Sequence, residues 1–232
     1  MPILNANTPV GEAVEDYAKA IFSLERRGDA VTAVSTSDLA ERLGVSAASV
    51  SAMVKKLDAL GLASHERYHG VRLTESGVRV ALEVLRHHRL LELFLAEELG
   101  VPWDRVHAEA EILEHVLSEE LEARIAAKLG DPVSDPHGDP IPSPELDLLE
   151  PETQAFDTCP VGTTGRFVRV SDTEPEMLRY LAERGIRPGQ RFVVVDRQPF
   201  GGPTSARFAA DPTVHPLGGD LARAMRVELD PS

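Results

Sequence analysis

The stretch that most constrains this chain is HAEAEILEH, residues 107–115, near the start of a helix that the apolar periodicity predicts from Val106 to about Lys128. Residues spaced three or four positions apart on an α-helix share one face. The stretch therefore places four possible metal ligands along one stripe, namely His107, Glu111, Glu114 and His115. We expect the opposite face to be buried in the core through Ile112, Leu113, Val116 and Leu117. Taken alone, a solvated Glu/His face fits the pattern equally well.

A second His/Glu pair upstream favours a metal site. His88 and Glu92 are four residues apart on a separate helix, predicted from Thr74 to about Leu99. Two helices that each present such a pair are typical of a divalent metal bound between helices. The two helices also have more apolar positions than one small core needs, which predicts a dimer surface. Its residues would be Leu90, Leu91, Phe94, Leu95 and Ile125.

The segment before this helix has a helix-turn-helix pattern. The run Ser35 to Ser37 is expected to cap a short helix, Asp38 to Leu43, and Gly44 to end it; Ser46 would cap a second helix that ends before Gly61. The following LASHERYHGVRLT is predicted to be a β-hairpin, so the whole is a winged helix. An ordinary helical hairpin is the alternative.

The second of these helices has residues suited to double-stranded DNA. Small side chains let a backbone approach base edges, and lysines next to them reach phosphates. Arg67, in the hairpin loop, can touch phosphate or the minor groove. The candidate DNA-binding residues are Ser46, Ala48, Ser49, Ser51, Ala52, Lys55, Lys56 and Arg67.

The overall charge of -14 would argue against a nucleic-acid partner, but the charge is unevenly distributed. Residues 1–73 hold 8 Lys/Arg and 9 Asp/Glu, a net of -1, so residues 74–232 carry the other -13. The single cysteine, Cys159, excludes an internal disulfide and a thiolate-rich zinc site. No apolar run is long enough for a membrane span and no secretion signal is recognisable, so we expect a soluble cytoplasmic protein.

The amino-acid composition changes after the predicted helices. Residues 132–160 are rich in Pro, Asp and Ser and are predicted to be a linker. The remainder is predicted to be a small β-barrel, with strands Phe167–Val170 and Arg191–Asp196, a helix Pro175–Arg184 and a last strand Ala222–Leu229. The expected domains are 1–73 (winged helix-turn-helix), 74–131 (helical, metal-binding and dimerising), 132–160 (linker) and 161–232 (barrel).

Together these segments resemble the diphtheria-toxin-repressor family of metal-dependent regulators. The specific pieces are HHRLLELFL, RVHAEAEILEHVLSEELEARI and PHGDPIP, in that order, and GIRPGQRFVVVD resembles the SH3-like domain of the family. The resemblance implies a mainly α fold with a small β domain. It contains an N-terminal winged helix-turn-helix, a helical metal-binding and dimerisation domain and a C-terminal SH3-like β-barrel.

The resemblance also implies two metal sites per subunit. The primary site would use Asp16, Glu111, Glu114 and His115. The ancillary site would use His88, Glu92 and His107, closed by a carboxylate of the barrel. Glu174 matches that position best, with Asp172 and Glu176 close by, and Met177 replaces the second barrel ligand of the family, a Gln.

The primary set distinguishes between branches of the family. Iron-responsive members have Met and Cys at the positions of Asp16 and Glu111, whereas oxygen and nitrogen ligands suit Mn²⁺. Short manganese regulators have a carboxylate at the position of Lys19 and lack the linker and barrel. The implied protein is a homodimeric, Mn²⁺-activated repressor of metal-uptake genes, bound to a palindromic operator, without an organic cofactor, a membrane partner or enzymatic activity.

Three alternatives remain open at this point. The metal can be Fe²⁺, which would make the protein an iron-dependent repressor of iron-uptake genes. A helical di-metal oxidoreductase also uses Glu/His pairs, but it needs ligands from four helices, and only three contribute here. A winged-helix regulator with an organic effector needs a pocket that this aromatic-poor chain has few residues to line.

Overall fold

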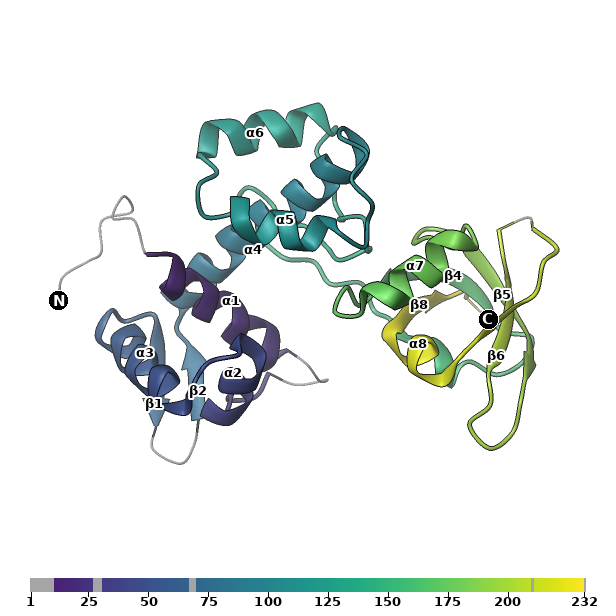
Figure 1. Ribbon diagram of the computed structural model, residues 1–232, viewed down its shortest axis with the longest axis horizontal. Helices are drawn as coiled ribbons and strands as arrows, with labels where there is room; N and C mark the ends of the chain where they lie inside the picture. Colours follow the sequence, from purple (N-terminus) through teal and green to yellow (C-terminus); the bar gives the residue numbers. More distant parts are fainter. Residues whose placement is uncertain (1–10, 27–30, 67–69, 210, 232) are drawn as a thin grey trace. The chain divides into compact units, whose positions relative to one another are not determined.

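The computed structural model describes residues 11–26, 31–66, 70–209 and 211–231 (Figure 1). They divide into two compact units, which we describe one at a time. The first unit comprises residues 1–86 and 144–147, and the second comprises residues 87–143 and 148–232. Within the described ranges, no helix combines the length and the apolar character needed to cross a bilayer.

The first unit is built on the helix-turn-helix that the capping residues predict. Its elements are α1 (Glu12–Glu25), α2 (Thr36–Leu43), α3 (Ala47–Ala59), β1 (Ala63–Glu66), β2 (Gly70–Leu73) and the start of α4 (Glu75–Glu97). Ser35 accepts a hydrogen bond from the Asp38 amide at 3.0 Å, and Ser46 accepts one from the Ser49 amide at 3.1 Å. Gly44 ends α2 with a φ of 64°, a conformation that favours glycine.

The wing is a short antiparallel sheet packed against these helices. β1 pairs with β2 from Ala63↔Leu73 to Glu66↔Gly70, and Val34 adds a bridge to Val71. The core of the unit contains fully buried side chains from α1, α2, α3 and the wing, including Ile21, Leu39, Val50, Val54, Leu57 and Val71. This core fixes which face of α3 remains in solvent.

The helical part of the second unit corrects one sequence expectation. The predicted helix from Val106 to Lys128 is two helices, α5 (Val106–Leu113) and α6 (Glu119–Lys128). Ser118 interrupts it because its side chain accepts a hydrogen bond from the Leu121 amide at 3.4 Å and starts α6 as an N-cap. Glu114 consequently forms the C-cap of α5, and His115 lies in the connection between the helices.

The expected burial of the apolar face is also wrong here, except at Leu117, which is partly buried against the core. Ile112 and Val116 are 71% and 72% exposed, and Leu113 is partly exposed. The residues expected to form a dimer surface lie instead in the core, fully buried except for the partly buried Phe94: Leu90, Leu91, Phe94, Leu95 and Ile125. The reason is that the His/Glu stripe of α5 faces α4, where histidines and carboxylates satisfy one another, so the apolar face turns outward.

The barrel part has a six-stranded antiparallel sheet in the order β3-β8-β4-β5-β6-β7 (Figure 1). Its elements are β3 (Gln154–Ala155), a 3₁₀ turn (Phe156–Thr158), β4 (Thr164–Val170), α7 (Pro175–Glu183), β5 (Arg191–Arg197), β6 (Thr204–Phe208), β7 (His215–Leu217), α8 (Gly219–Ala224) and β8 (Met225–Leu229). The predicted strand Ala222–Leu229 therefore begins as helix α8. Cys159 is buried in the core with the ring of Phe156, and four phenylalanines form ring contacts there.

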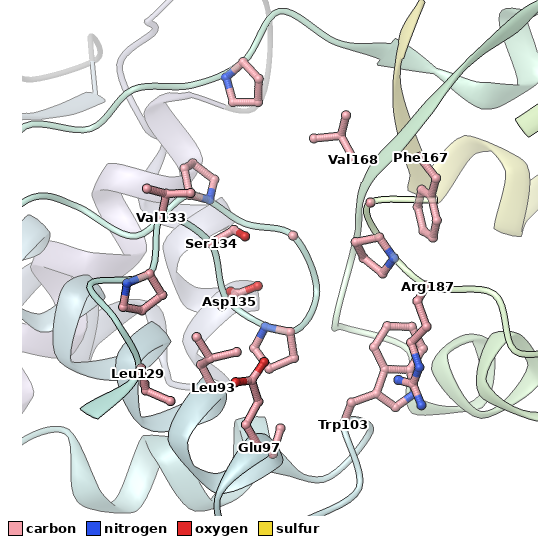
Figure 2. Close-up of a pocket in the computed structure, with 18 of the residues that line it drawn as sticks. Leu93, Glu97, Trp103, Leu129, Val133, Ser134, Asp135, Phe167, Val168 and Arg187 are labelled. Carbon is pink, nitrogen blue, oxygen red and sulfur yellow. The ribbon is translucent and has the colours of Figure 1, made fainter. Parts of the chain in front are cut away.

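Trp103 connects the helical part of the second unit to the barrel. Its indole N–H donates a hydrogen bond to the Leu178 carbonyl of α7 at 3.1 Å. Its ring stacks on the His137 ring at 5.7 Å between centroids. The Arg187 guanidinium lies 4.3 Å from the centroid of the indole ring (Figure 2). An open cleft of about 1100 Å³ adjoins this point. Phe167 also lines the cleft but is fully buried, so the cleft offers an organic ligand little exposed aromatic surface.

Candidate metal centre and nucleic-acid interface

A cluster of two histidines and two carboxylates lies where α4, α5 and the barrel meet. α4 supplies His88 and Glu92, α5 supplies His107, and Asp172 follows the end of β4. One ligand atom of each residue lies within 4.8 Å of the others. Glu92 Oε1 is 3.0 Å from His88 Nε2 and 3.2 Å from His107 Nδ1. Asp172 Oδ2 is 2.9 Å from His107 Nδ1. These are nitrogen and hard oxygen donors, a set that suits Mn²⁺ or Fe²⁺.

The barrel carboxylate at this cluster is Asp172. Glu174, which the sequence favoured, is instead the exposed N-cap residue of α7. The Glu176 side chain is 92% exposed and lies within 3.9 Å of Arg179. Met177 packs against the barrel core. The position along the backbone explains why Asp172 and not Glu174 lies at the cluster. Asp172 is two residues after the end of β4, whereas Glu174 is already the N-cap of α7.

His88 joins the two ligand sets that the sequence analysis kept apart. Its Nε2 faces Glu92 and lies 3.1 Å from His107 Nδ1. Its Nδ1 lies 2.5 Å from Glu114 Oε2 and 3.8 Å from Glu111 Oε1. An imidazole has only two nitrogens, so His88 presents one to each set. A change in the charge or position of the ligands in either set can therefore affect the other set through the His88 ring.

The structure adds two residues that the sequence analysis did not consider as ligands, Asp135 and His137. Asp135 Oδ1 accepts hydrogen bonds from the amides of His137 at 2.8 Å and Asp139 at 3.0 Å, which forms a tight turn. Gly138 has a φ of 90°, and a Cβ there would lie 1.9 Å from the Val168 carbonyl oxygen. Only glycine lets this turn lie against β4. The motif PHGDPIP could have indicated His137 as a ligand, because it contains the one histidine of the Pro-rich stretch.

The protonation of His137 supports its role as a ligand. Its Nε2 lies 2.7 Å from the Trp103 carbonyl, which can only accept, so Nε2 carries the hydrogen. In the neutral ring, Nδ1 then carries a lone pair. This atom is buried, has no hydrogen-bond partner among the described residues, and lies 3.8 Å from Glu92 Oε2. A buried lone pair beside a carboxylate fits a site for a cation.

The electrostatics describe a cluster that holds protons when no metal is bound. Hydrogen bonding to Asp172 and Glu92 raises the pKa of His107 to about 10. Burial works against charging His137, but the Glu92 carboxylate outweighs it and raises the pKa of that ring to about 9. Burial likewise opposes ionisation of Glu92, yet the three imidazoles beside it lower its pKa well below the ordinary value. Protons thus occupy the positions that a divalent cation would take.

The residues of the expected primary site lie on three elements. Asp16 is in α1 of the first unit, one turn before Lys19 on the same helix. Glu111 is in the last turn of α5, with Oε1 3.6 Å from His107 Nε2, and Glu114 is its C-cap. His115 Nε2 lies 3.5 Å from Glu114 Oε1. Within the second unit, the carboxylates of the expected primary set thus lie next to the ancillary histidines.

The candidate DNA-binding residues of α3 all lie on its solvent side. Ser46, Ala48, Ser49, Ser51, Ala52, Lys55 and Lys56 are exposed, while Val50, Val54 and Leu57 turn into the core. The Ser49 hydroxyl lies 2.8 Å from that of Ser46, and the Ser51 hydroxyl donates to the Ala47 carbonyl at 2.8 Å. Most side chains on the exposed face are therefore short, and the serine hydroxyls lie against the helix backbone or its cap. Arg67 lies outside the described residues.

Comparison with known proteins explains this combination of elements. Residues 10–71 match the model of the iron-dependent repressor N-terminal DNA-binding domain, and residues 74–143 match that of the iron-dependent repressor metal-binding and dimerisation domain. Residues 156–229 match the FeoA domain. The chain belongs to the iron-dependent repressor family. The expected fold class, a winged helix, a helical domain and an SH3-like β domain, is thereby confirmed.

Full-length relatives support the same membership in this repressor family. The iron-dependent repressor IdeR of Mycobacterium tuberculosis is 33% identical over 94% of this chain and 97% of its own length. The diphtheria toxin repressor of Corynebacterium diphtheriae is 32% identical, with the same coverage. A solved structure described as a manganese-dependent transcriptional repressor in complex with manganese is 45% identical, with a TM-score of 0.84, over 92% of this chain and 98% of that one.

This membership decides between the classes of function considered above. The chain is a metal-dependent transcriptional repressor and not an enzyme, because the family consists of repressors. The helical di-metal oxidoreductase and the regulator with an organic effector are therefore not favoured.

Proposed function

We propose that this repressor is activated by Mn²⁺, with Fe²⁺ as the second candidate, and that it binds a palindromic operator of metal-uptake genes as a homodimer. The observation that carries the proposal is the cluster of His88, Glu92, His107 and Asp172, which offers nitrogen and oxygen donors only. Hard ligands of this kind suit Mn²⁺. The similar solved structure that contains manganese supports the same choice. A DNA-binding repressor of this kind would act in the cytoplasm.

We assign the ancillary site to the cluster in the second unit. Four residues would ligate through atoms that already converge, namely His88, Glu92, His107 and Asp172. His137 would add Nδ1. Asp135 holds the turn that presents His137 and is therefore a positioning residue. Glu174 is no longer part of this proposed set.

For the primary site we keep the ligands that the sequence predicts. Asp16, Glu111, Glu114 and His115 would ligate the activating metal, which gives two sites per subunit. Three carboxylates at one site would repel one another. A divalent cation bound among them supplies positive charge that offsets this repulsion. Asp16 would thereby fasten α1, the helix that leads into the winged domain, when metal is present.

We propose that the DNA-binding element is the exposed face of α3. Lys55 and Lys56 would contact phosphates, and the small residues Ala48, Ser49, Ser51 and Ala52, with the cap Ser46, would let the helix enter the major groove. Arg67 would contact DNA from the wing. Contacts from small side chains specify few bases, so the shape of the operator would contribute to recognition.

The homodimer would form through the apolar face that the structure leaves in solvent. Ile112 and Val116 are its most exposed apolar residues, and Leu121 in α6 is 49% exposed. A two-fold dimer presents two copies of α3, and two half-sites then read a palindrome. The functional division that accompanies this proposal is 1–73 for DNA, 74–131 for metal and dimerisation, 132–160 as linker and 161–232 as barrel.

The test is metal-dependent operator binding by the full chain. We expect Mn²⁺ to promote binding in a gel-shift titration more effectively than Fe²⁺, Co²⁺ or Zn²⁺ at matched free concentrations. Asp16→Ala should raise the Mn²⁺ concentration needed for half-maximal binding by about tenfold or more, because one carboxylate ligand is lost. Glu12→Ala, which removes an exposed carboxylate of the same helix, is the matched control. Unchanged operator binding in the presence of a chelator would overturn the proposal.

A further inference from the structure

A second cluster of metal-ligating side chains lies away from the proposed centre. His87 of α4 points its Nε2 toward two carboxylates at the start of α6. Glu122 Oε2 is 3.2 Å away and Glu119 Oε1 is 3.7 Å away. His87 and Glu122 are each only 7% exposed, whereas the Glu119 side chain is 76% exposed. The cluster is therefore buried on one side and open to water on the other.

The other nitrogen of His87 fixes which atom is available as a ligand. Nδ1 lies 3.2 Å from the backbone carbonyl oxygen of Glu114. A carbonyl oxygen can only accept, so Nδ1 carries the hydrogen and donates it. In a neutral ring, Nε2 then presents its lone pair to two negative carboxylates. This arrangement is repulsive unless a positive charge lies between them, either a proton on Nε2 or a metal cation.

We propose that His87, Glu119 and Glu122 form a third metal site, which binds a divalent first-row transition metal. A histidine whose Nδ1–H donates to a backbone carbonyl is the usual arrangement of a metal-ligating imidazole, because the outer hydrogen bond fixes the tautomer and the ring. One nitrogen and two carboxylates match the ligands that Mn²⁺, Co²⁺ and Zn²⁺ accept. The open side at Glu119 leaves room for water to complete the coordination.

The position of this site gives it a consequence beyond the proposed function. An ion held there would join α4 to the first turn of α6. Through the hydrogen bond from His87 to the Glu114 carbonyl, it would also hold the end of α5. The site would thus stabilise the connection between α5 and α6, which contains Glu114 and His115. It would act as a structural ion and would require neither operator DNA nor the ligand Asp16.

The experiment counts metal ions on the full chain. Protein is dialysed to equilibrium against Mn²⁺, and in parallel against Co²⁺, and bound metal is measured by atomic emission. We expect Glu119→Gln and Glu122→Gln each to bind about one ion fewer per chain than the wild type at a limiting metal concentration. Each loss should correspond to a roughly tenfold weaker site, as for the loss of one ligand interaction.

Glu120→Gln is the matched control, because Glu120 is an exposed carboxylate of the same helical turn that pairs with Arg124 and not with His87. It should bind as much metal as the wild type. Glu119 is exposed, so its substitution leaves folding intact, and a melting curve verifies this. Equal metal content in the wild type and both Gln variants would show that a proton alone satisfies His87, which overturns the proposal. Operator binding is not the readout, so failure of the proposed function leaves this result interpretable.

Discussion

At the scale of single residues, Glu92 is the centre of the metal cluster. Its carboxylate faces His88, His107 and His137 at distances between 3.0 and 3.8 Å, and it is 1% exposed. A buried carboxylate is stable only when positive charge or hydrogen bonds compensate it. Here protonated imidazoles provide that compensation, and a divalent cation would replace them. Metal binding and proton release are therefore coupled at this residue.

The raised pKa values of His107 and His137 predict how metal affinity depends on pH. With values of about 10 and about 9, both rings carry protons at neutral pH in the metal-free protein. A ligating imidazole must lose that proton, so Mn²⁺ affinity should rise with pH by about tenfold per unit for each proton released. We expect the rise to continue from pH 6.5 to 8.5. Binding of the ancillary ion should therefore begin to weaken well above the pH of about 6 that ordinary histidines would give.

Calorimetry in two buffers of different ionisation enthalpy measures the number of protons released. His107→Gln removes one titrating group and should lower that number by about one. His65→Gln is the matched control, because it removes a histidine of the wing that is far in the sequence from the cluster. An affinity that stays constant across this pH range would contradict the predicted coupling.

At the scale of secondary-structure elements, the break between α5 and α6 shows where sequence reasoning stops. The capping patterns of α2 and α3 were predicted because Ser35, Gly44 and Ser46 determine their ends by local hydrogen bonds and backbone conformation. Ser118 acts by the same local rule, but it lies inside an apolar pattern that continues past it. Periodicity alone therefore joins the two helices. The sequence also could not show that a polar stripe faces inward, since this depends on α4 packing against it.

The exposed apolar face of α5 and the following connection gives a prediction about assembly. Ile112→Glu together with Val116→Glu should convert the proposed homodimer to monomer, because two charges from each subunit would be buried at the two-fold interface. Both positions are more than 70% exposed in the chain described here, so the folding of the subunit should be unaffected. Sedimentation velocity measures the change. Val133→Glu, at an 81% exposed apolar residue on a different segment, is the control. A double variant that sediments as the wild-type dimer would place the interface elsewhere.

The candidate site could be predicted in part for physical reasons. His88, Glu92 and His107 are candidate ligands by helical spacing, and the family resemblance added their grouping into one site and the barrel carboxylate. Which carboxylate it is depends on where β4 ends and α7 begins, a boundary that sequence patterns locate only approximately. His137 was missed because it reaches the cluster through a turn, and a turn has no periodicity to read.

At the scale of the whole molecule, the uneven charge reconciles an acidic protein with a DNA partner. The first 73 residues are nearly neutral, and the excess of 13 negative charges lies in the remainder. The metal clusters occupy this acidic part. Each bound divalent cation lowers its negative charge, so metal should reduce the electrostatic repulsion between the protein and DNA as well as order the chain.

The fluorescence of Trp103 should change when metal binds at the proposed ancillary site. It is the single tryptophan of the chain, and it stacks on His137 and donates to α7 of the barrel. Mn²⁺ binding at the ancillary site should quench its fluorescence, because the metal is paramagnetic. In Asp172→Asn we expect the Mn²⁺ concentration for half-maximal quenching to rise about tenfold or more. Glu174→Gln should leave it unchanged. A larger effect from Glu174→Gln would restore the carboxylate that the sequence first favoured.

The carboxylate that faces His107 belongs to the barrel, while its imidazole partners belong to the helices and the turn before it. A shorter version of this chain, ending after residue 143, would still contain Asp16, Glu111, Glu114 and His115. It would lose Asp172 and leave the indole of Trp103 in water. The barrel therefore supplies a ligand to the proposed ancillary site alone, and a chain without it would keep every residue of the proposed primary site.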